Sequence, residues 1–216
     1  MCRPNACTLS LLAALLIIFS SLCLICLALG LYVIFSPSPH PPDFRVDSLA
    51  FSNLNLNLSS SSITANWAVN FIVVNPNKKT TLYFGKLKAT IYYNQGFKKR
   101  PFRFRYHDNL LSATAVLPFL VPPEGNQTSI RATFVAVGAY LDEKLVERIN
   151  VSRGSRVVFD VRVSGRVWLS SRRWWFLNDY MKVYCGDLAV GMNSSTSSGG
   201  GKLIGGPREC LVDAWR

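Results

Sequence analysis

Two groups of basic residues have side chains that could bind an anionic ligand. The first contains Lys98, Lys99, Arg100, Arg103 and Arg105. The second contains Arg172 and Arg173, directly before Trp174, Trp175 and Phe176. Ammonium and guanidinium groups attract polyanions, so both groups are candidate sites for a polyanion or a partner protein. The alternative is structural: the first group is then a solvated strand face, and the second is a loop whose aromatic residues cap the edge of a sheet.

Residues for catalysis are scarce by comparison. The only histidines are His40 and His107, and neither a metal-ligand spacing nor a nucleophile elbow is present. The run "GGGKLIGG" at 199–206 lacks the spacing of a phosphate-binding P-loop. We therefore expect a protein that is not an enzyme and that needs no cofactor or metal. Arginine beside aromatic residues can also bind single-stranded nucleic acid, but the topology described below argues against a nucleic-acid partner.

An uncharged run from Leu9 to Phe35 predicts a transmembrane helix. At about 1.5 Å per residue this helix would be about 40 Å long, which exceeds the hydrocarbon core of a bilayer. A cleaved signal peptide is the alternative, because Ala28, Leu29 and Gly30 resemble a cleavage site. The apolar run continues past Gly30, however, and is longer than a signal peptide requires, which favours an uncleaved signal anchor.

Flanking charges predict the orientation of this helix. Arg3 precedes it, whereas the first basic residue after it is Arg45, which favours a cytosolic N-terminus. We expect a cytosolic head at 1–8, a single span at 9–35, a Pro-rich stalk at 36–43 that holds the domain off the bilayer, and an extracytoplasmic domain at 44–216. Only Arg3 of the 24 basic residues precedes the stalk, and all 12 acidic residues lie within or after it, so the outer portion carries a net charge of +11. Such a domain should attract lipid headgroups or acidic polysaccharide.

Cysteines and glycosylation motifs agree with an outer location. Cys185 and Cys210 are the only cysteines after the predicted span, and an oxidising compartment favours a disulfide between them. Two buried thiols are the alternative. Cys2 and Cys7 lie beside the predicted membrane and are candidates for palmitoylation. The four N-glycosylation motifs begin at Asn57, Asn126, Asn150 and Asn193.

Alternation of apolar and polar residues predicts an all-β domain. From Ile63 to Val73 every second residue is apolar, and we expect this strand and the next, which ends near Tyr93, to form a hairpin around Asn75-Pro76-Asn77. In the second strand, Tyr83 should share its face with Leu87. A further strand with alternating faces is expected at 157–164, and its polar side chains should be exposed to solvent. The other expected strands are 44–58, 101–106, 129–140, 181–190 and 209–215.

One helix and one flexible loop complete the expected elements. Leu141, Leu145 and Ile149 recur every fourth residue and predict a helix at 141–150. The Ser- and Gly-rich stretch at 193–206 is expected to be a loop. About seven short antiparallel strands favour a two-sheet sandwich, of the immunoglobulin or fibronectin type, over a barrel.

The order of these features resembles a plant family, the NDR/HIN-like proteins, which contain a late embryogenesis abundant group 2 domain. The segments that carry the resemblance are "VNFIVVNPNKKTTLYFGKLKATIYY", "LPFLVPPEGNQT", "MKVYCGDLAV" and "ECLVDAW". The sequence departs from the family after Pro118-Phe119, at Trp174-Trp175 and in the Gly-rich stretch. The resemblance implies a plasma-membrane protein with an outer β-sandwich, no enzymatic activity, and a function in plant defence and stress responses, and the four glycosylation motifs add that it is a glycoprotein.

Two functions follow as hypotheses. The first is a non-enzymatic, single-span membrane protein whose basic outer domain binds partner proteins, other membrane or cell-wall components, or further copies of itself. The second is a module that binds lipid or another apolar ligand between its sheets, with Trp174, Trp175 and Phe176 at the entrance.

Overall fold

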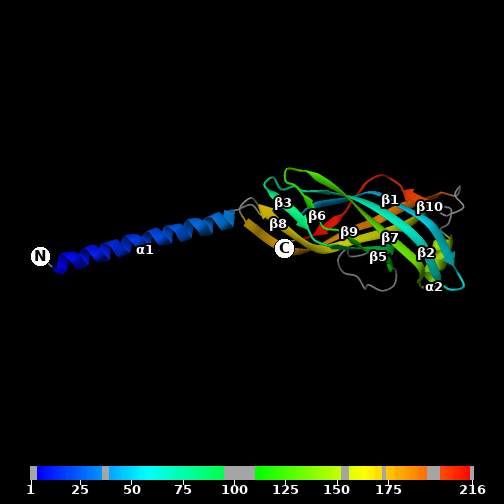
Figure 1. The fold of residues 1–216 in the computed structure, drawn as a ribbon, viewed down its shortest axis with the longest axis horizontal. Coiled ribbons are helices and arrows are strands. Elements are labelled where there is room, and N and C mark those ends of the chain that lie inside the picture. Colours follow the sequence, from blue (N-terminus) through cyan, green and yellow to red (C-terminus); the bar gives the residue numbers. More distant parts are fainter. Residues whose placement is uncertain are drawn as a thin grey trace. The chain divides into compact units, whose positions relative to one another are not determined.

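The chain divides into two compact units, Met1–Pro39 and His40–Arg216. The computed structural model describes residues 4–35, 39–94, 110–151, 156–171, 174–193 and 200–214 (Figure 1). The first unit contains the helix α1 (Pro4–Phe35). The elements of the second unit are β1 (Asp43–Asn57), β2 (Ser62–Val74), β3 (Thr80–Phe84), β4 (Leu87–Tyr93), β5 (Leu110–Val116), β6 (Phe119–Val121), β7 (Gln127–Tyr140), α2 (Glu143–Val151), β8 (Arg156–Ser171), β9 (Trp174–Asn193), β10 (Gly200–Leu203), β11 (Arg208–Glu209) and β12 (Leu211–Asp213).

Helix α1 is long and apolar enough to cross a membrane, between Ala13 and Leu31. Two polar side chains of this span are satisfied within the helix. The hydroxyls of Ser20 and Ser21 donate hydrogen bonds to the carbonyls of residues 17 and 18, at 2.9 and 2.8 Å. Backbone acceptors inside the same helix remove the cost of placing these hydroxyls in hydrocarbon. The helix is therefore suited to be a single membrane span or a signal anchor.

The second unit is mostly β-strand. Its antiparallel strands follow the order β5-β4-β8-β9-β10-β1-β2-β7, with β11 and β12 on β1 and β9, and β3 between β6 and β8. Strands β5 and β7 end this order, yet Ser112 Oγ of β5 donates a hydrogen bond to the carbonyl of Val135 in β7 at 2.7 Å. The sheet therefore curves enough to bring its two ends together.

Strand β2 shows how alternation builds the core. All six residues expected on one face, Ile63, Ala65, Trp67, Val69, Phe71 and Val73, are buried, which confirms that face. Phe159 of β8 packs edge-on against both Trp67 and Phe51, with ring centroids 6.3 and 6.1 Å apart. Burial of these large rings supplies much of the hydrophobic free energy of the domain.

The face predicted for Tyr83 is wrong. Leu82 and Phe84 of β3 are buried, whereas Tyr83 is only partly buried. Gly85 and Lys86 separate β3 from β4 and shift the alternation by one residue before Leu87. Both strands pair with β8, one after the other along its length.

The expected hairpin around Asn75-Pro76-Asn77 is also wrong. Strand β2 pairs with β1 and β7, whereas β3 pairs with β6 and β8. The segment instead crosses between strands that are not paired with each other. The buried Asn75 amide donates to the carbonyls of Thr80, Val121 and Pro122, at 2.7, 3.1 and 3.0 Å. These bonds hold β3 and β6 beside the end of β2, so Asn75 has a structural function.

Asn77 fixes the start of the folded unit. Its amide donates to the carbonyl of His40 at 2.8 Å, and its Oδ1 accepts from the His40 backbone N–H at 2.8 Å. Strand β1 then begins at Asp43. Residues 40–43 therefore belong to the folded unit.

The predicted helix at 141–150 and the predicted loop at 193–206 have different outcomes. Helix α2 lies in the stretch predicted as a helix, and the Oδ1 of Asp142 caps it by accepting the Lys144 N–H at 3.0 Å. The predicted loop at 193–206 instead contains β10, which pairs with β1 and β9. Gly201 is needed there because a Cβ would lie 2.6 Å from the Phe51 ring. This glycine therefore permits close packing and not flexibility.

Candidate functional site

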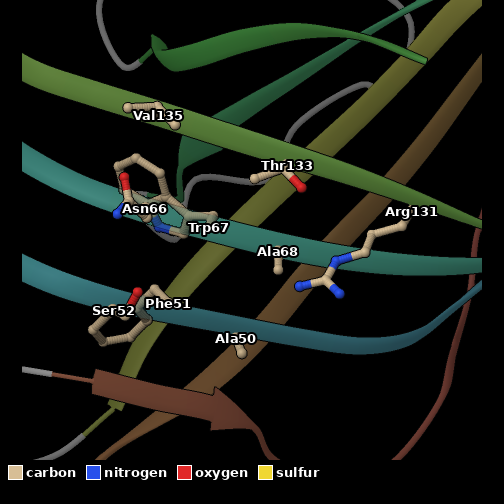
Figure 2. A pocket seen from close by; sticks show the side chains of 9 residues that line it. All are labelled: Ala50, Phe51, Ser52, Asn66, Trp67, Ala68, Arg131, Thr133 and Val135. Carbon is tan, nitrogen blue, oxygen red and sulfur yellow. The ribbon is translucent and has the colours of Figure 1, made fainter. Parts of the chain in front are cut away.

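A solvent-open hollow of about 420 Å³ lies over β1, β2 and β7 (Figure 2). This volume falls in the range of about 300–1,000 Å³ that small-ligand sites occupy. We call the outward-facing side chains of β10, β1, β2 and β7 the β7 face. No carboxylate lines the hollow.

The floor of the hollow follows from strand register. Residues paired across antiparallel strands project to the same face. Ala50 of β1 pairs with Ala68 of β2, which pairs with Thr133 of β7. Because two adjacent positions of this row are alanine, the surface is recessed between its neighbours. The flanking rows are Ser52, Asn66 and Val135 on one side and Ser48, Asn70 and Arg131 on the other.

Arg131 provides the positive charge of the hollow. Figure 2 shows its side chain extending from β7 across β2, with the guanidinium beside Ala68. The side chain is exposed, and it forms no hydrogen bond or ion pair with another residue that the structure describes. Its guanidinium is thus available to a ligand, and its planar donors suit a carboxylate.

Two neighbours add to this chemistry. Asn70 donates to Ser48 Oγ at 2.8 Å, which fixes both side chains at the edge of the hollow. Lys202 of β10 pairs with Ala50, so it belongs to the same row as the alanine floor. Lys202 is exposed and, like Arg131, has no partner among the described residues. Around the hollow, the β7 face therefore combines unpaired cations with neutral polar groups.

A second hollow, of about 400 Å³, lies over β4 and β5 and includes Lys86, Lys88 and Thr114. We call the outward-facing side chains of β5, β4, β8 and β9 the β8 face. Ser164 of β8 joins Lys88 to Lys182 in one row across this face. The β8 face is therefore basic as well. Both faces include carboxylates, among them the exposed Asp43 and Asp47 of β1 on the β7 face, although none lines the hollow there.

Asp160 lies at the centre of the polar groups on the β8 face. It was expected to be wetted, and this is wrong, because only 2% of its surface is exposed. Its Oδ1 accepts from the Asn94 amide at 2.8 Å and from the Asp187 N–H at 3.1 Å, and its Oδ2 accepts from the Tyr184 hydroxyl at 3.1 Å. A bulge opposite Asp160, at residues 186 and 187 of β9, supplies that N–H. Buried carboxylates require such donors.

The surroundings of Tyr184 favour the protonated form of its hydroxyl. Burial raises the pKa of Tyr184 well above its ordinary value, the charge of Asp160 and the hydrogen bond to it add to the shift, and Arg162 opposes it. The Arg162 guanidinium lies 5.0 Å from the ring centroid of Tyr92 and 5.6 Å from that of Tyr184. Arg162 is thus engaged within the fold by cation–π contacts.

The structure joins Cys185 to Cys210 by a disulfide, the pair considered from the sequence. Cys185 is fully buried in β9, next to the bulge that faces Asp160. The bridge ties the C-terminal strands to the core of the second unit. Among the described residues, no group of three or more His, Cys, Asp or Glu side chains is suited to bind a metal.

The other candidates from the sequence have varied positions. Asn57 ends β1 and is exposed, Asn126 is exposed before β7, Asn150 is partly buried in α2, and Asn193 ends β9. Cys7 lies in α1, whereas Cys2 lies outside the described residues. The basic candidates also lie outside them: Lys98, Lys99, Arg100, Arg103, Arg105, Arg172 and Arg173.

Sequence reasoning missed Arg131, Lys202 and the residues around Asp160. Arg131 alternates with the buried Ile130 and Ala132, so its outward direction was readable from the sequence. Its position beside an alanine floor was not readable from the sequence, because that position depends on the register of three strands.

No model of a known protein family matches the chain, and a search of curated proteins finds no significant relative. The resemblance to the NDR/HIN-like proteins therefore stays a prediction.

Proposed function

We propose that this chain is a non-enzymatic, single-span membrane protein that displays a basic β-domain outside the cytoplasm, where the domain binds polyanions or acidic partner proteins. The observation that carries the proposal is the β7 face, where Arg131 and Lys202 remain unpaired beside a hollow without carboxylates. The net charge of +11 after the predicted span supports the same ligand class.

Three features support an extracytoplasmic location. Helix α1 is suited to be a signal anchor, the Cys185–Cys210 disulfide is typical of an oxidising compartment, and the exposed Asn57 and Asn126 are accessible for glycosylation. The resemblance to the NDR/HIN-like proteins adds the plasma membrane as the site and plant defence and stress responses as the setting. It also supports a two-sheet sandwich as the arrangement of the strands.

Retention on an anionic matrix tests the binding function. Full-length protein in an uncharged detergent should be retained on a sulfated polysaccharide column and should elute as salt is raised, because exposed charge pairs are screened. A neutral polysaccharide column is the control. Equal retention on both columns, unaffected by salt, would contradict the proposal, and a co-purified lipid would favour the apolar-ligand hypothesis instead.

Protease treatment of intact plant protoplasts tests the location. With an N-terminal tag, the proposal expects a short protected tagged fragment and a gel shift of the untreated protein after glycosidase. A protected, unglycosylated domain would place the domain in the cytosol or in an organelle interior and contradict the proposed display.

A further inference from the structure

We propose that the hollow on the β7 face binds a uronic-acid residue of an acidic polysaccharide, with Arg131 holding the sugar carboxylate. This inference rests on the proposed function and names its ligand class and site. A carboxylate matches the two-pronged donor geometry of a guanidinium, which forms paired hydrogen bonds with it. Because Arg131 has no partner among the described residues, ligand binding need not break an existing ion pair.

Neutral polar groups around Arg131 favour a sugar over a simple anion. Asn66, Ser52 and Thr133 border the alanine floor and offer both donors and acceptors. A sugar hydroxyl needs both, whereas phosphate or sulfate would be served best by further cations. Strands lie about 4.8 Å apart, so the rows from β10 to β7 extend across about 14 Å. A hollow bounded in this way accommodates a sugar ring together with its neighbours in a polymer.

The alanine floor and Lys202 indicate how a polymer would cross the hollow. Ala50 and Ala68 leave space for a ring to approach the backbone of β1 and β2. Lys202, in register with Ala50, places a second cation across the floor from Thr133. An acidic polymer that crosses the strands could thus place one carboxylate at Arg131 and another at Lys202. Among the outward-facing residues of the lining, only Val135 is large and apolar, which argues against an acyl chain.

The test measures binding of an oligomer of four galacturonic acid residues to full-length protein in neutral-lipid nanodiscs. The fully methyl-esterified oligomer is the matched ligand control, because it keeps the sugar framework and loses the charge. We expect the acid to bind and the ester to bind at least tenfold more weakly, since a charge-assisted pair contributes about tenfold or more.

Four variants locate the site. Arg131→Gln removes the charge and should weaken binding about tenfold, and Arg131→Lys keeps the charge but loses the paired donors, which should weaken it severalfold. Ala68→Leu fills the floor without changing charge and should also weaken binding about tenfold. Arg166→Gln makes the same charge change at an exposed position on the β8 face and should stay within about twofold. Unchanged thermal unfolding confirms that each variant is folded.

Each result decides between the two proposals. If Arg131→Gln and Ala68→Leu bind the acid as tightly as the natural protein does, the hollow is not the site, although the polyanion function stands. If the natural protein binds a sulfated polysaccharide or inorganic phosphate but not the uronate, the function stands and the assigned ligand is wrong. If it binds no polyanion at all, the proposed function itself fails.

Discussion

The two basic faces of the β-domain use their cations differently. On the β8 face, Arg162 lies over two tyrosine rings, and Asp160 accepts three hydrogen bonds. On the β7 face, Arg131 extends beside Ala68 and has no partner among the described residues. Both faces contain cations and carboxylates. Their contacts indicate that the polar groups of the β8 face stabilise the fold, whereas those of the β7 face are available to a ligand.

The neighbours of each arginine account for this difference. Aromatic residues flank Arg162 on β4 and β9, and the bulge in β9 aims a backbone N–H at Asp160. Arg131 meets Asn70 on β2, and the next row contains two alanines. Small neighbours cannot engage a guanidinium, so it stays in solvent. Substitutions on the two faces should therefore affect different properties.

The largest expected effect is on stability. Asp160→Ala should lower the free energy of unfolding by about 3–5 kcal/mol, because Tyr184 and the Asp187 N–H lose their buried acceptor. Arg131→Ala, on the β7 face, should change it by less than about 0.5 kcal/mol. Denaturant titration of the full-length protein in detergent measures both. Equal losses from the two substitutions would remove the distinction between the faces.

Removal of the disulfide should have a somewhat smaller effect. Cys185 and Cys210 are 25 residues apart, and replacing both with alanine should cost about 3 kcal/mol through the greater entropy of the unfolded chain. The same denaturant titration checks this value. Treatment of the natural protein with a reductant is the control, and it should reproduce the loss. A double variant as stable as the natural protein would show that the bridge does not stabilise the second unit.

Tyr184→Phe should lower the free energy of unfolding by only about 1 kcal/mol at neutral pH, since one hydrogen bond to Asp160 is lost. Its pH dependence is more informative. The folded state raises the pKa of Tyr184, so the folded protein binds this proton more tightly than the unfolded chain does. The stabilisation is complete below about pH 10, the ordinary tyrosine pKa, and is lost as pH rises above it.

Comparison of unfolding free energies between pH 8 and 11 isolates this contribution. As pH rises, the free energy of unfolding of the natural protein should fall more steeply than that of Tyr184→Phe. The difference in stability between the two proteins should therefore disappear at high pH. Tyr180→Phe, on the same strand but exposed, is the control and should follow the natural protein. Parallel curves for Tyr184→Phe and the natural protein would contradict the assignment of Tyr184 as a buried donor.

The elements that sequence predicted well are those in which local pattern decides. The alternation in β2 depends only on residues of one strand, and its buried face was predicted in full. Strand pairing depends on distant segments, and so Asn75-Pro76-Asn77 was mistaken for a hairpin turn although it joins unpaired strands. The glycines of β10 signalled flexibility in sequence, yet Gly201 lies against the Phe51 ring.

The same distinction applies to the candidate site. The sequence clusters at 98–105 and 172–173 drew attention through charge density, and they lie outside the described residues. Arg131 was overlooked because it is isolated in sequence, and only the register of β1, β2 and β7 places it at the hollow. Asp160 interrupts an apolar strand, a signal that was visible, but its donors come from three other positions along the chain.

Arginine-selective labelling with phenylglyoxal, read by peptide mass spectrometry, tests the central contrast most directly. Full-length protein in neutral-lipid nanodiscs is labelled with and without polygalacturonate. We predict that Arg131 reacts readily and becomes protected by the polymer, whereas Arg162 reacts slowly in both conditions because two tyrosine rings cover it. Protection of Arg162 or Arg166 by the polymer, with Arg131 still reactive, would contradict the account and assign binding to the β8 face.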